Sequence, residues 1–237
     1  MNEQLKTTFQ PNFLGSSAWR LALHPKINVA SARKLARAST IAKGNKSFLL
    51  HNTDQPDLAA KLIKYRSLPR DVFRKYVGGQ ARREYFATCK LREWGIPCPG
   101  VWGYAFSISP CNKYESLLIL DYQKHHRNAR RYLETTDDHH ARQRLLDAIA
   151  HDIGAIYQRG FHHNDCHLGN VLVDARGHHV WIDNELRRVK NTRQLASRFE
   201  ESLLLLDRSF KKSVDPRTKS AFLALCRHSA GIPKRGR

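Results

Sequence analysis

A carboxylate and an amide stand five positions apart in a short glycine-containing segment that precedes a strand-like apolar run. They are Asp165 and Asn170, and the run is Val171–Val173. A second carboxylate, Asp183, follows after a short turn. Phosphoryl transfer needs a carboxylate beside the attacking hydroxyl and oxygen ligands for magnesium, and a rigid loop followed by a hairpin can direct all three to one point. The spacing therefore indicates a candidate site for phosphate chemistry.

The composition fits a globular chain that folds without covalent staples. The chain has 237 residues, 41% of them hydrophobic, which suits one large domain or two small lobes that share a cleft. Its five cysteines form no CxxC pair, so reduced thiols in a cytoplasm are expected rather than a zinc ribbon or a disulfide framework. No apolar run approaches the roughly 20 residues that cross a bilayer, and the first residues lack a signal-peptide apolar region. We therefore expect a cytoplasmic protein that is neither exported nor integral to a membrane.

The chain carries a large excess of positive charge. Its 41 lysines and arginines stand against 21 acidic residues, for a formal net charge of +20. Such an excess attracts phosphate-rich partners such as nucleotides, nucleic acid or an anionic lipid surface. A solvated basic surface is the alternative interpretation, because charge alone does not identify the partner.

The first half of the chain has the pattern of a small antiparallel sheet that carries one helix. Residues 1–37 combine turn signals with a basic stretch, 31–37, that is typical of a short helix. Five strand-like runs follow, at 39–42, 47–51, 58–65, 99–104 and 116–122. The last two flank a turn at 110–112. Residues 79–94 predict the helix, which a glycine and a proline end.

The second half has a mostly helical pattern around one hairpin. Apolar residues recur at helical spacing over residues 138–159. Val171–Val173 and residues 179–182 predict two strands joined by a tight turn, and a further helix is expected at 199–210. The carboxylates and the amide of the candidate site thus lie before and after the strands of this hairpin.

The residues His163-Asn164-Asp165, then Asn170 and Asp183, resemble the catalytic loop and the metal-binding aspartate of the protein-kinase-like superfamily. Within that superfamily the chain is most similar to the bacterial lipopolysaccharide core kinases, which phosphorylate heptose or Kdo sugars of the inner core. Four segments carry this resemblance, at residues 59–66, 83–85, 94–99 and 163–183. Together they span about residues 40–210.

The resemblance implies an α+β, two-lobed protein-kinase-like fold. Residues 1–121 would form the N-lobe, a small antiparallel sheet with one main helix and an N-terminal extension at about 1–37. Residues 122–237 would form a mostly helical C-lobe. The implied activity is transfer of a phosphoryl group from ATP, with Mg2+, to a sugar hydroxyl of the lipopolysaccharide core. The glycolipid acceptor would place the enzyme at the cytoplasmic face of the inner membrane, in peripheral contact with its anionic surface.

The resemblance also implies roles for four residues of the second half. Asp165 would accept or orient the proton of the substrate hydroxyl, and His163 would brace the loop. Asn170 and Asp183 would hold magnesium.

The nucleotide would be bound by residues of the first half. Lys61 would bind its phosphates and Glu84 would position Lys61 through an ion pair. Lys64, on the opposite strand face, is the competing lysine. The turn at Gly44 would cover the phosphates, although a plain hairpin is the alternative. The segment that contains Leu120 and Tyr122 would be the hinge that offers backbone groups to adenine.

The chain departs from typical protein kinases at three points. Asp183 is followed by Asn184 and Glu185 rather than Phe-Gly, Asn164 replaces the common arginine of the catalytic triplet, and no GxGxxG precedes Lys61. The residues after Asp183 argue against a switchable activation segment, and Asn164 argues against control by a phosphorylated loop.

Other interpretations of the same residues stay open. A transition-metal site at His162, His163, Cys166 and His167 would need a helix to bring the histidines together, and the glycines predict a loop. Basic residues at 124–131 and 187–193 form either a rim that attracts the phosphorylated sugar and an anionic leaflet or a solvated face. The acceptor could instead be a protein or a small hydroxylated molecule. A weakly active kinase-like module that binds nucleic acid or anionic lipid is the remaining alternative, although few aromatic residues interleave the basic runs.

Overall fold

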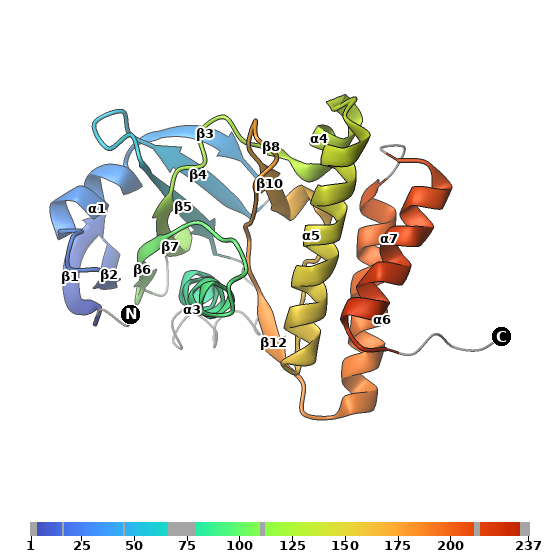
Figure 1. Cartoon of the computed structure of the whole chain (residues 1–237). Coiled ribbons are helices and arrows are strands. Elements are labelled where there is room, and N and C mark those ends of the chain that lie inside the picture. The colour runs from blue at the N-terminus through green and yellow to red at the C-terminus, as the bar shows by residue number, and fades with distance from the viewer. Residues whose placement is uncertain are drawn as a thin grey trace. The chain divides into compact units, whose positions relative to one another are not determined.

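Two compact units make up the chain in the computed structural model (Figure 1), which describes residues 4–15, 17–44, 46–65, 79–109, 112–210 and 214–232. Unit 1 comprises residues 1–89 and 99–123, and unit 2 comprises residues 90–98 and 124–237. Unit 1 is built on an antiparallel sheet, whereas unit 2 is mostly helical. The α+β class predicted from the sequence is therefore confirmed.

Unit 1 contains a seven-stranded sheet in the order β1-β2-β6-β7-β5-β4-β3. Its strands are β1 (Lys6–Leu14), β2 (Ser17–Leu23), β3 (Ser39–Lys43), β4 (Ser47–His51), β5 (Leu58–Lys64), β6 (Val101–Ser107) and β7 (Tyr114–Asp121). All neighbouring strands pair antiparallel. Strands β3 to β7 match the five predicted runs. Of the turn predicted at 110–112, residues 110 and 111 lie outside the described residues.

Two helices of unit 1 pack on opposite faces of this sheet. They are α1 (Val29–Ala36) and α3 (Gly79–Glu93), the latter confirmed almost to its predicted ends. Side chains alternate along β5, so Ala60 and Leu62 join the core that contains α1 while Ile63 joins the core that contains α3. The residue between Leu62 and Ala60, Lys61, therefore lies on the α3 face.

The prediction for residues 1–37 was wrong in part, because a strand hairpin stands where turn signals were expected. β1 and β2 pair with each other, and β2 continues the sheet through β6. Pro11 lies in β1, which is an edge strand, where a residue without an N–H is tolerated. The register also shifts between Gln10 and Leu14, next to this proline. Trp19 and Leu21 of β2 are fully buried, so the hairpin belongs to the core and is not an extension.

Unit 2 is built on α4 (Ala129–Thr135), α5 (His139–Gln158), α6 (Thr192–Phe210) and α7 (Pro216–Ser229). Its short strands are β8 (Arg127–Asn128), β9 (Phe161–His163), β10 (Val171–Val173), β11 (His179–Trp181) and β12 (Leu186–Arg188). The predicted long helix and hairpin are confirmed as α5, which Asp138 caps, and as β10 with β11. The predicted start of the last helix was wrong: α6 begins at Thr192, because Asn191 accepts a hydrogen bond from the Gln194 N–H and caps it.

One contiguous core joins these elements of unit 2. It includes Leu146 and Ile149 of α5, Trp181 of β11, Leu206 of α6 and Phe222 of α7, each at most 2% exposed. In the part of the chain that the structure describes, no helix is long and apolar enough to cross a membrane.

Candidate functional site

Two strand pairs of unit 2 hold the candidate catalytic loop beside the segment that carries Asp183. β9 pairs with β12 at the start of the loop, and β10 pairs with β11 at its end. The Asn164 N–H donates to the Glu185 carbonyl at 2.9 Å, and the Ile182 N–H donates to the Asn170 carbonyl at 2.9 Å. Residues 164–170 and 182–185 are therefore fastened to each other at both ends.

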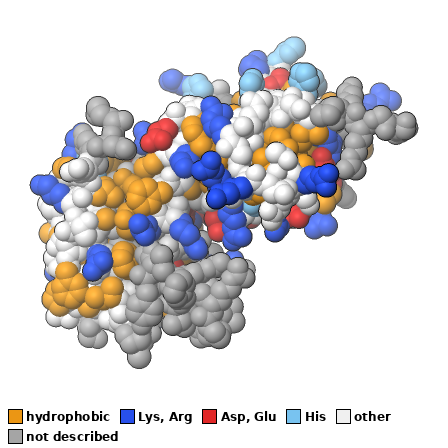
Figure 2. Space-filling model, turned by 90° about the horizontal axis from the view of Figure 1, so that it is seen from below, with side chains coloured by type: hydrophobic (Ala, Val, Ile, Leu, Met, Phe, Trp, Pro, Cys, Tyr) orange, Lys and Arg blue, Asp and Glu red, His pale blue; other side chains and the backbone are white. Residues whose placement is uncertain are grey.

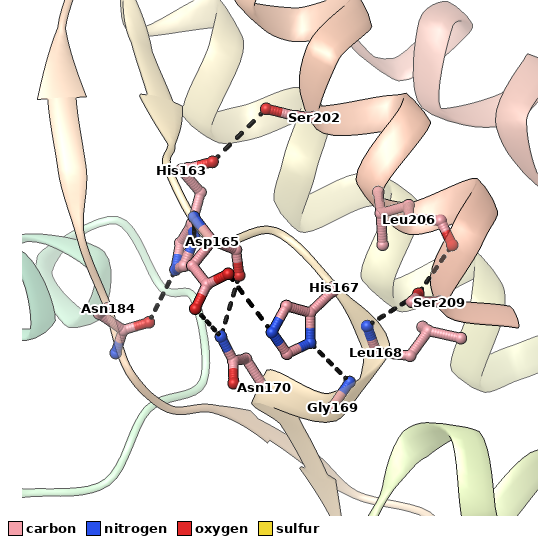
Figure 3. Close-up of polar contacts among 10 residues, drawn as sticks. All are labelled: His163, Asp165, His167, Leu168, Gly169, Asn170, Asn184, Ser202, Leu206 and Ser209. Atoms are coloured by element: carbon pink, nitrogen blue, oxygen red, sulfur yellow. Dashed lines mark hydrogen bonds and ion pairs between the residues drawn. The ribbon is translucent and has the colours of Figure 1, made fainter. Parts of the chain in front are cut away.

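Asp165 is the exposed carboxylate of this loop, and two side chains surround it (Figure 3). The Asn170 amide Nδ2 donates to the Asp165 carbonyl at 3.0 Å and to Oδ2 at 3.1 Å. His167 Nε2 lies 3.4 Å from Oδ1. The hydrogen bond from His167, assisted by the one from Asn170, lowers the pKa of Asp165 to about 2. Asp165 is therefore ionised at neutral pH.

His167 has a defined tautomer when it is neutral. The Gly169 N–H donates to its Nδ1 at 3.1 Å, so Nδ1 is the acceptor and the ring proton is on Nε2, which faces Asp165. The same hydrogen bond with Asp165 raises the pKa of His167. A local backbone contact thus orients the imidazole toward the Asp165 carboxylate.

His163 and Asn184 connect the loop to the Asp183 segment from the buried side. The Asp165 N–H donates to His163 Nδ1 at 3.3 Å, and His163 Nε2 lies 3.3 Å from Asn184 Oδ1. The Asn184 amide in turn donates to the Trp181 carbonyl at 3.1 Å. Burial lowers the pKa of His163, so its ring is neutral, with Nδ1 accepting and Nε2–H donating.

Helix α6 supports the loop through two serines (Figure 3). Ser202 Oγ donates to the His163 carbonyl at 3.4 Å. Ser209 Oγ accepts from the Leu168 N–H at 3.1 Å and donates to the Leu206 carbonyl at 2.7 Å. The backbone on both sides of Asp165 is therefore tied to a rigid helix.

Asn170 and Asp183 supply oxygen atoms of the kind that magnesium prefers. The Asn170 Nδ2 is directed at Asp165, so the amide Oδ1 is the atom suited to a cation. Asp183 lies in the turn after β11 with a φ of 55°, a left-handed conformation that aspartate adopts more readily than most residues. Its charge reaches His167, whose pKa it helps to raise. The oxygen atoms of this asparagine and this aspartate fit Mg2+, which prefers hard oxygen ligands. A cluster of three or more His, Cys, Asp or Glu side chains that could hold a metal ion does not occur among the described residues.

Lys61 and Glu84 form a buried ion pair in unit 1. Lys61 Nζ lies 2.9 Å from Oε1 and 2.7 Å from Oε2 of Glu84, and the two residues are 8% and 5% exposed. Ala59, which is 1% exposed, lies on the same face of β5 as Lys61. The ion pair that the resemblance implied is therefore present, while its part in nucleotide binding stays a prediction.

The competing lysine and the predicted turn have other contacts. Lys64 Nζ lies 4.5 Å from the centre of the Phe48 ring, a cation–π geometry. The Gly44 N–H donates to the Ser47 carbonyl at 2.8 Å, as in an ordinary hairpin turn.

The predicted hinge residues lie at the end of β7. Leu120 pairs with Ala59 across the sheet. The Tyr122 N–H donates to the Asp57 carbonyl at 2.8 Å, and its ring stacks on His51 at 4.1 Å. A hinge contact with adenine would therefore use other groups of this segment than the Tyr122 N–H.

Two residues of the site were not assigned to it from the sequence. His167 was considered only as a metal ligand, and Asn184 only as a departure from the usual motif. The signal for Asn184 was a polar residue directly after Asp183, where typical protein kinases have an apolar one. It is 2% exposed, so its polarity required a partner, which is His163.

The fold is similar to that of solved structures. A structure titled "WaaP in complex with acyl carrier protein" matches with a TM-score of 0.58 at 16% identity, covering 81% of this chain and 79% of that one. A structure titled "High resolution (2.2 A) crystal structure of WbdD" has a TM-score of 0.47 at 17% identity, with 81% of this chain and 46% of that chain covered. The first of these likenesses confirms the predicted kinase-like fold.

The family comparison covers both units. No curated protein matches the chain by sequence. The model of the family described as "Lipopolysaccharide kinase (Kdo/WaaP) family" matches residues 62–225, which is more than half of the chain and includes the whole loop from His163 to Asp183. This match confirms the resemblance found in the sequence, and the chain belongs to the lipopolysaccharide kinase (Kdo/WaaP) family.

Proposed function

We propose that this member of the family transfers the γ-phosphoryl group of ATP to a sugar hydroxyl, of heptose or Kdo, in the inner core of lipopolysaccharide. The observation that carries the proposal is the pair of fastened loops in unit 2. They combine an ionised, exposed carboxylate, Asp165, with the oxygen donors of Asn170 and Asp183. Phosphoryl transfer needs this combination more than it needs a strong nucleophile on the protein.

Asp165 would orient the acceptor hydroxyl and receive its proton late in the reaction. A carboxylate with a pKa of about 2 is a weak base, so early abstraction of an alcohol proton is unfavourable. In a loose phosphoryl-transfer transition state the hydroxyl becomes acidic only as its bond to phosphorus forms. His167 and Asn170 would fix the carboxylate for that moment, since each contacts one of its oxygens.

Asn170 and Asp183 would hold Mg2+, and Lys61 would bind the nucleotide phosphates. When bound, the metal neutralises charge on the transferred phosphoryl group. Glu84 would keep Lys61 extended, which the two short contacts support. Lys61 is favoured over Lys64 because it shares the Ala59 face, whereas Lys64 is engaged with Phe48. Gly44 would lie over the phosphates, and Leu120 and Tyr122 would lie next to adenine.

The acceptor would approach unit 2 from a basic surface, and the protein would act peripherally at the cytoplasmic face of the inner membrane. Basic side chains greatly outnumber acidic ones on the face shown in Figure 2, in line with the net charge of +20. Arg130 of α4 lies close enough to the loop for its charge to act on His167. A cation at that distance would attract the phosphate and carboxylate groups of a core glycolipid.

The decisive experiment uses purified protein, ATP, magnesium and core glycolipid, with phosphate incorporation followed by mass spectrometry. The wild-type protein should add one phosphate to an inner-core sugar, and Asp165→Ala and Asp183→Ala should each abolish the addition. Core oligosaccharide from cells that lack the protein should likewise lack one phosphate.

Other outcomes separate the alternatives. ATP turnover that depends on Asp165 but adds no phosphate to any core glycan would indicate another acceptor, either a protein or a small hydroxylated molecule. Salt-sensitive binding to nucleic acid without any turnover would indicate a binding module. Full activity in both aspartate variants would show that the catalytic assignment is wrong.

A further inference from the structure

A cavity lies in unit 1, and none of its lining residues is assigned to the reaction. Its volume is about 660 Å3, and it is lined by the C-terminal half of α1, by β3 and by the end of β4 with the turn that follows. Arg33 and Lys34 line it from α1, Arg37 from the C-cap of that helix, His51 from β4, and Ile41 from β3. A volume of this size is typical of small-molecule sites.

The lining of this cavity is strongly basic. Three of its side chains are permanent cations, and no aspartate or glutamate is among the lining residues. Lys34 forms an ion pair with Asp54, which neutralises one of the three. The Arg33 Nε is buried without a hydrogen-bond partner. The Arg37 side chain makes no hydrogen bond or ion pair with any described residue. The Arg33 guanidinium lies 6.0 Å from the centre of the Phe13 ring, so among the described residues no acidic side chain neutralises either arginine.

The helix dipole explains only part of this cluster of basic residues. Cations near a helix C-terminus interact favourably with the helix dipole, and Arg33 and Lys34 lie in the last turn of α1. However, Arg33 and Arg37 are four residues apart, where like charges repel on a helix surface. The buried Arg33 Nε–H without an acceptor has a further cost in free energy, which the helix dipole does not explain. An anion in the cavity would relieve the repulsion between the two arginines.

We propose that this cavity binds a phosphate-bearing ligand, either the headgroup of an anionic phospholipid or a soluble phosphate ester. A phosphate group has enough acceptor oxygens to contact Arg33 and Arg37 together, and the planar guanidinium matches it in two-pronged hydrogen bonding. Ser39, which also lines the cavity, supplies a neutral donor. Ile41, 44% exposed, presents an apolar side chain at the same place, as an acyl chain next to a headgroup would require. The site goes beyond the kinase reaction and does not depend on it.

The test compares two double variants that remove the same charge. Arg33→Gln with Arg37→Gln empties the cavity of its uncompensated cations. Lys6→Gln with Arg20→Gln removes two exposed cations from β1 and β2, at the other end of the same sheet. Binding is measured with vesicles of phosphatidylglycerol and phosphatidylcholine, with vesicles of phosphatidylcholine alone, and with glycerol 3-phosphate in solution.

The cavity variant should bind the phosphate ligand about 25-fold more weakly, about fivefold for each cation, while the control variant should lose far less. Binding of wild type to phosphatidylglycerol vesicles would identify the lipid headgroup as the source of the phosphate, and binding to glycerol 3-phosphate alone would identify a soluble ester. Equal losses in the two double variants, or no binding to either phosphate probe, would overturn the proposal.

A third variant tests the cavity without changing α1, in case the arginine substitutions unfold that helix. Ser39→Asp adds a negative charge to the lining from β3 and leaves the helix intact, so it should weaken phosphate binding as well. Phosphorylation of the core glycolipid by the Arg33→Gln/Arg37→Gln variant reports separately on the kinase reaction, because neither arginine belongs to that site. If Ser39→Asp bound phosphate as tightly as wild type, the ligand would not occupy this cavity.

Discussion

Charged residues with proposed roles in the reaction are held in opposite ways in the two units. In unit 1, Lys61 and Glu84 neutralise each other inside the protein, at 8% and 5% exposure. In unit 2, the carboxylate of Asp165 is exposed, and its partners are an imidazole and an amide that belong to the same loop. The first arrangement depends on a strand and a helix that are distant in sequence, and the second on six consecutive residues, 165–170.

This difference predicts which substitutions change the stability of the protein and which change its catalysis. Removing one member of a buried ion pair leaves the other charge without compensation, which destabilises the fold strongly. An exposed carboxylate is solvated by water, so its loss changes the chemistry much more than the stability. We therefore expect substitutions in unit 2 to affect turnover first, and those at the ion pair of unit 1 to affect stability first.

The largest effect is expected for Asp165→Asn. The amide keeps the size of the carboxylate but cannot receive the hydroxyl proton, so kcat should fall about 100- to 10,000-fold. The free energy of unfolding, measured by urea titration, should change by less than about 1 kcal/mol, because the side chain is exposed. Asp147→Asn on the exposed side of α5 is the matched control and should leave both quantities unchanged. A loss of several kcal/mol of stability in Asp165→Asn would remove the contrast between the units.

The ion pair of unit 1 should give the reverse result. Glu84→Leu leaves the Lys61 ammonium buried, so the free energy of unfolding should fall by about 3–5 kcal/mol. Adding Lys61→Met removes the remaining charge and should restore much of that stability, while phosphoryl transfer stays lost because the proposed phosphate-binding group is absent. Urea titration of the two single variants and the double variant measures the effect. If the double variant were no more stable than Glu84→Leu, the ion pair would not be the source of the loss.

The sequence indicated the candidate residues of unit 2 but not the contacts that hold their loop in place. Asp165, Asn170 and Asp183 are close in the chain, so their spacing alone indicated that they act together. The contacts from Ser202 and Ser209 depend on where α6 packs, which no local pattern contains. The same limit applied to the first 23 residues, where β2 joins the sheet through its pairing with the distant strand β6.

The ion pair of unit 1 was accessible only through resemblance. Lys61 and Glu84 are 23 positions apart, and neither carries a local signal of its own in a chain with so many cations. Strand alternation did place Lys61 on the same face as Ala59 and opposite to Lys64, and the packing of α3 against that face then brings Glu84 within reach. Local periodicity thus predicted the direction of the side chain but not its partner.

A smaller effect is expected for the buried link between the two loops of unit 2. Asn184→Ala removes the partner of His163 Nε2–H and a donor to the Trp181 carbonyl, so the free energy of unfolding should fall by about 1–3 kcal/mol. kcat should also fall, because His163 orients the backbone N–H of Asp165. Gln143→Ala on exposed α5 should stay within about 0.5 kcal/mol of wild type. Lost stability with unchanged kcat would show that this link supports the fold and not the catalytic loop.

The smallest effect is the dependence of stability on pH. We expect stability to fall on both sides of a maximum, because His163 and His167 have pKa values shifted in opposite directions. Burial lowers the pKa of His163 below its unfolded value, so the unfolded state binds more protons and stability is lost as the pH falls below about 6.5. Asp165 raises the pKa of His167, so that contribution is complete below about 6.5 and is lost as the pH rises through the folded pKa. Thermal unfolding between pH 5 and 8 should therefore show a maximum near pH 6.5, with limbs of at most about 1.4 kcal/mol per pH unit for each proton. His167→Gln should flatten the alkaline limb and keep the acidic one; if instead both limbs survived unchanged, the contact between His167 and Asp165 would contribute nothing to the stability of the loop.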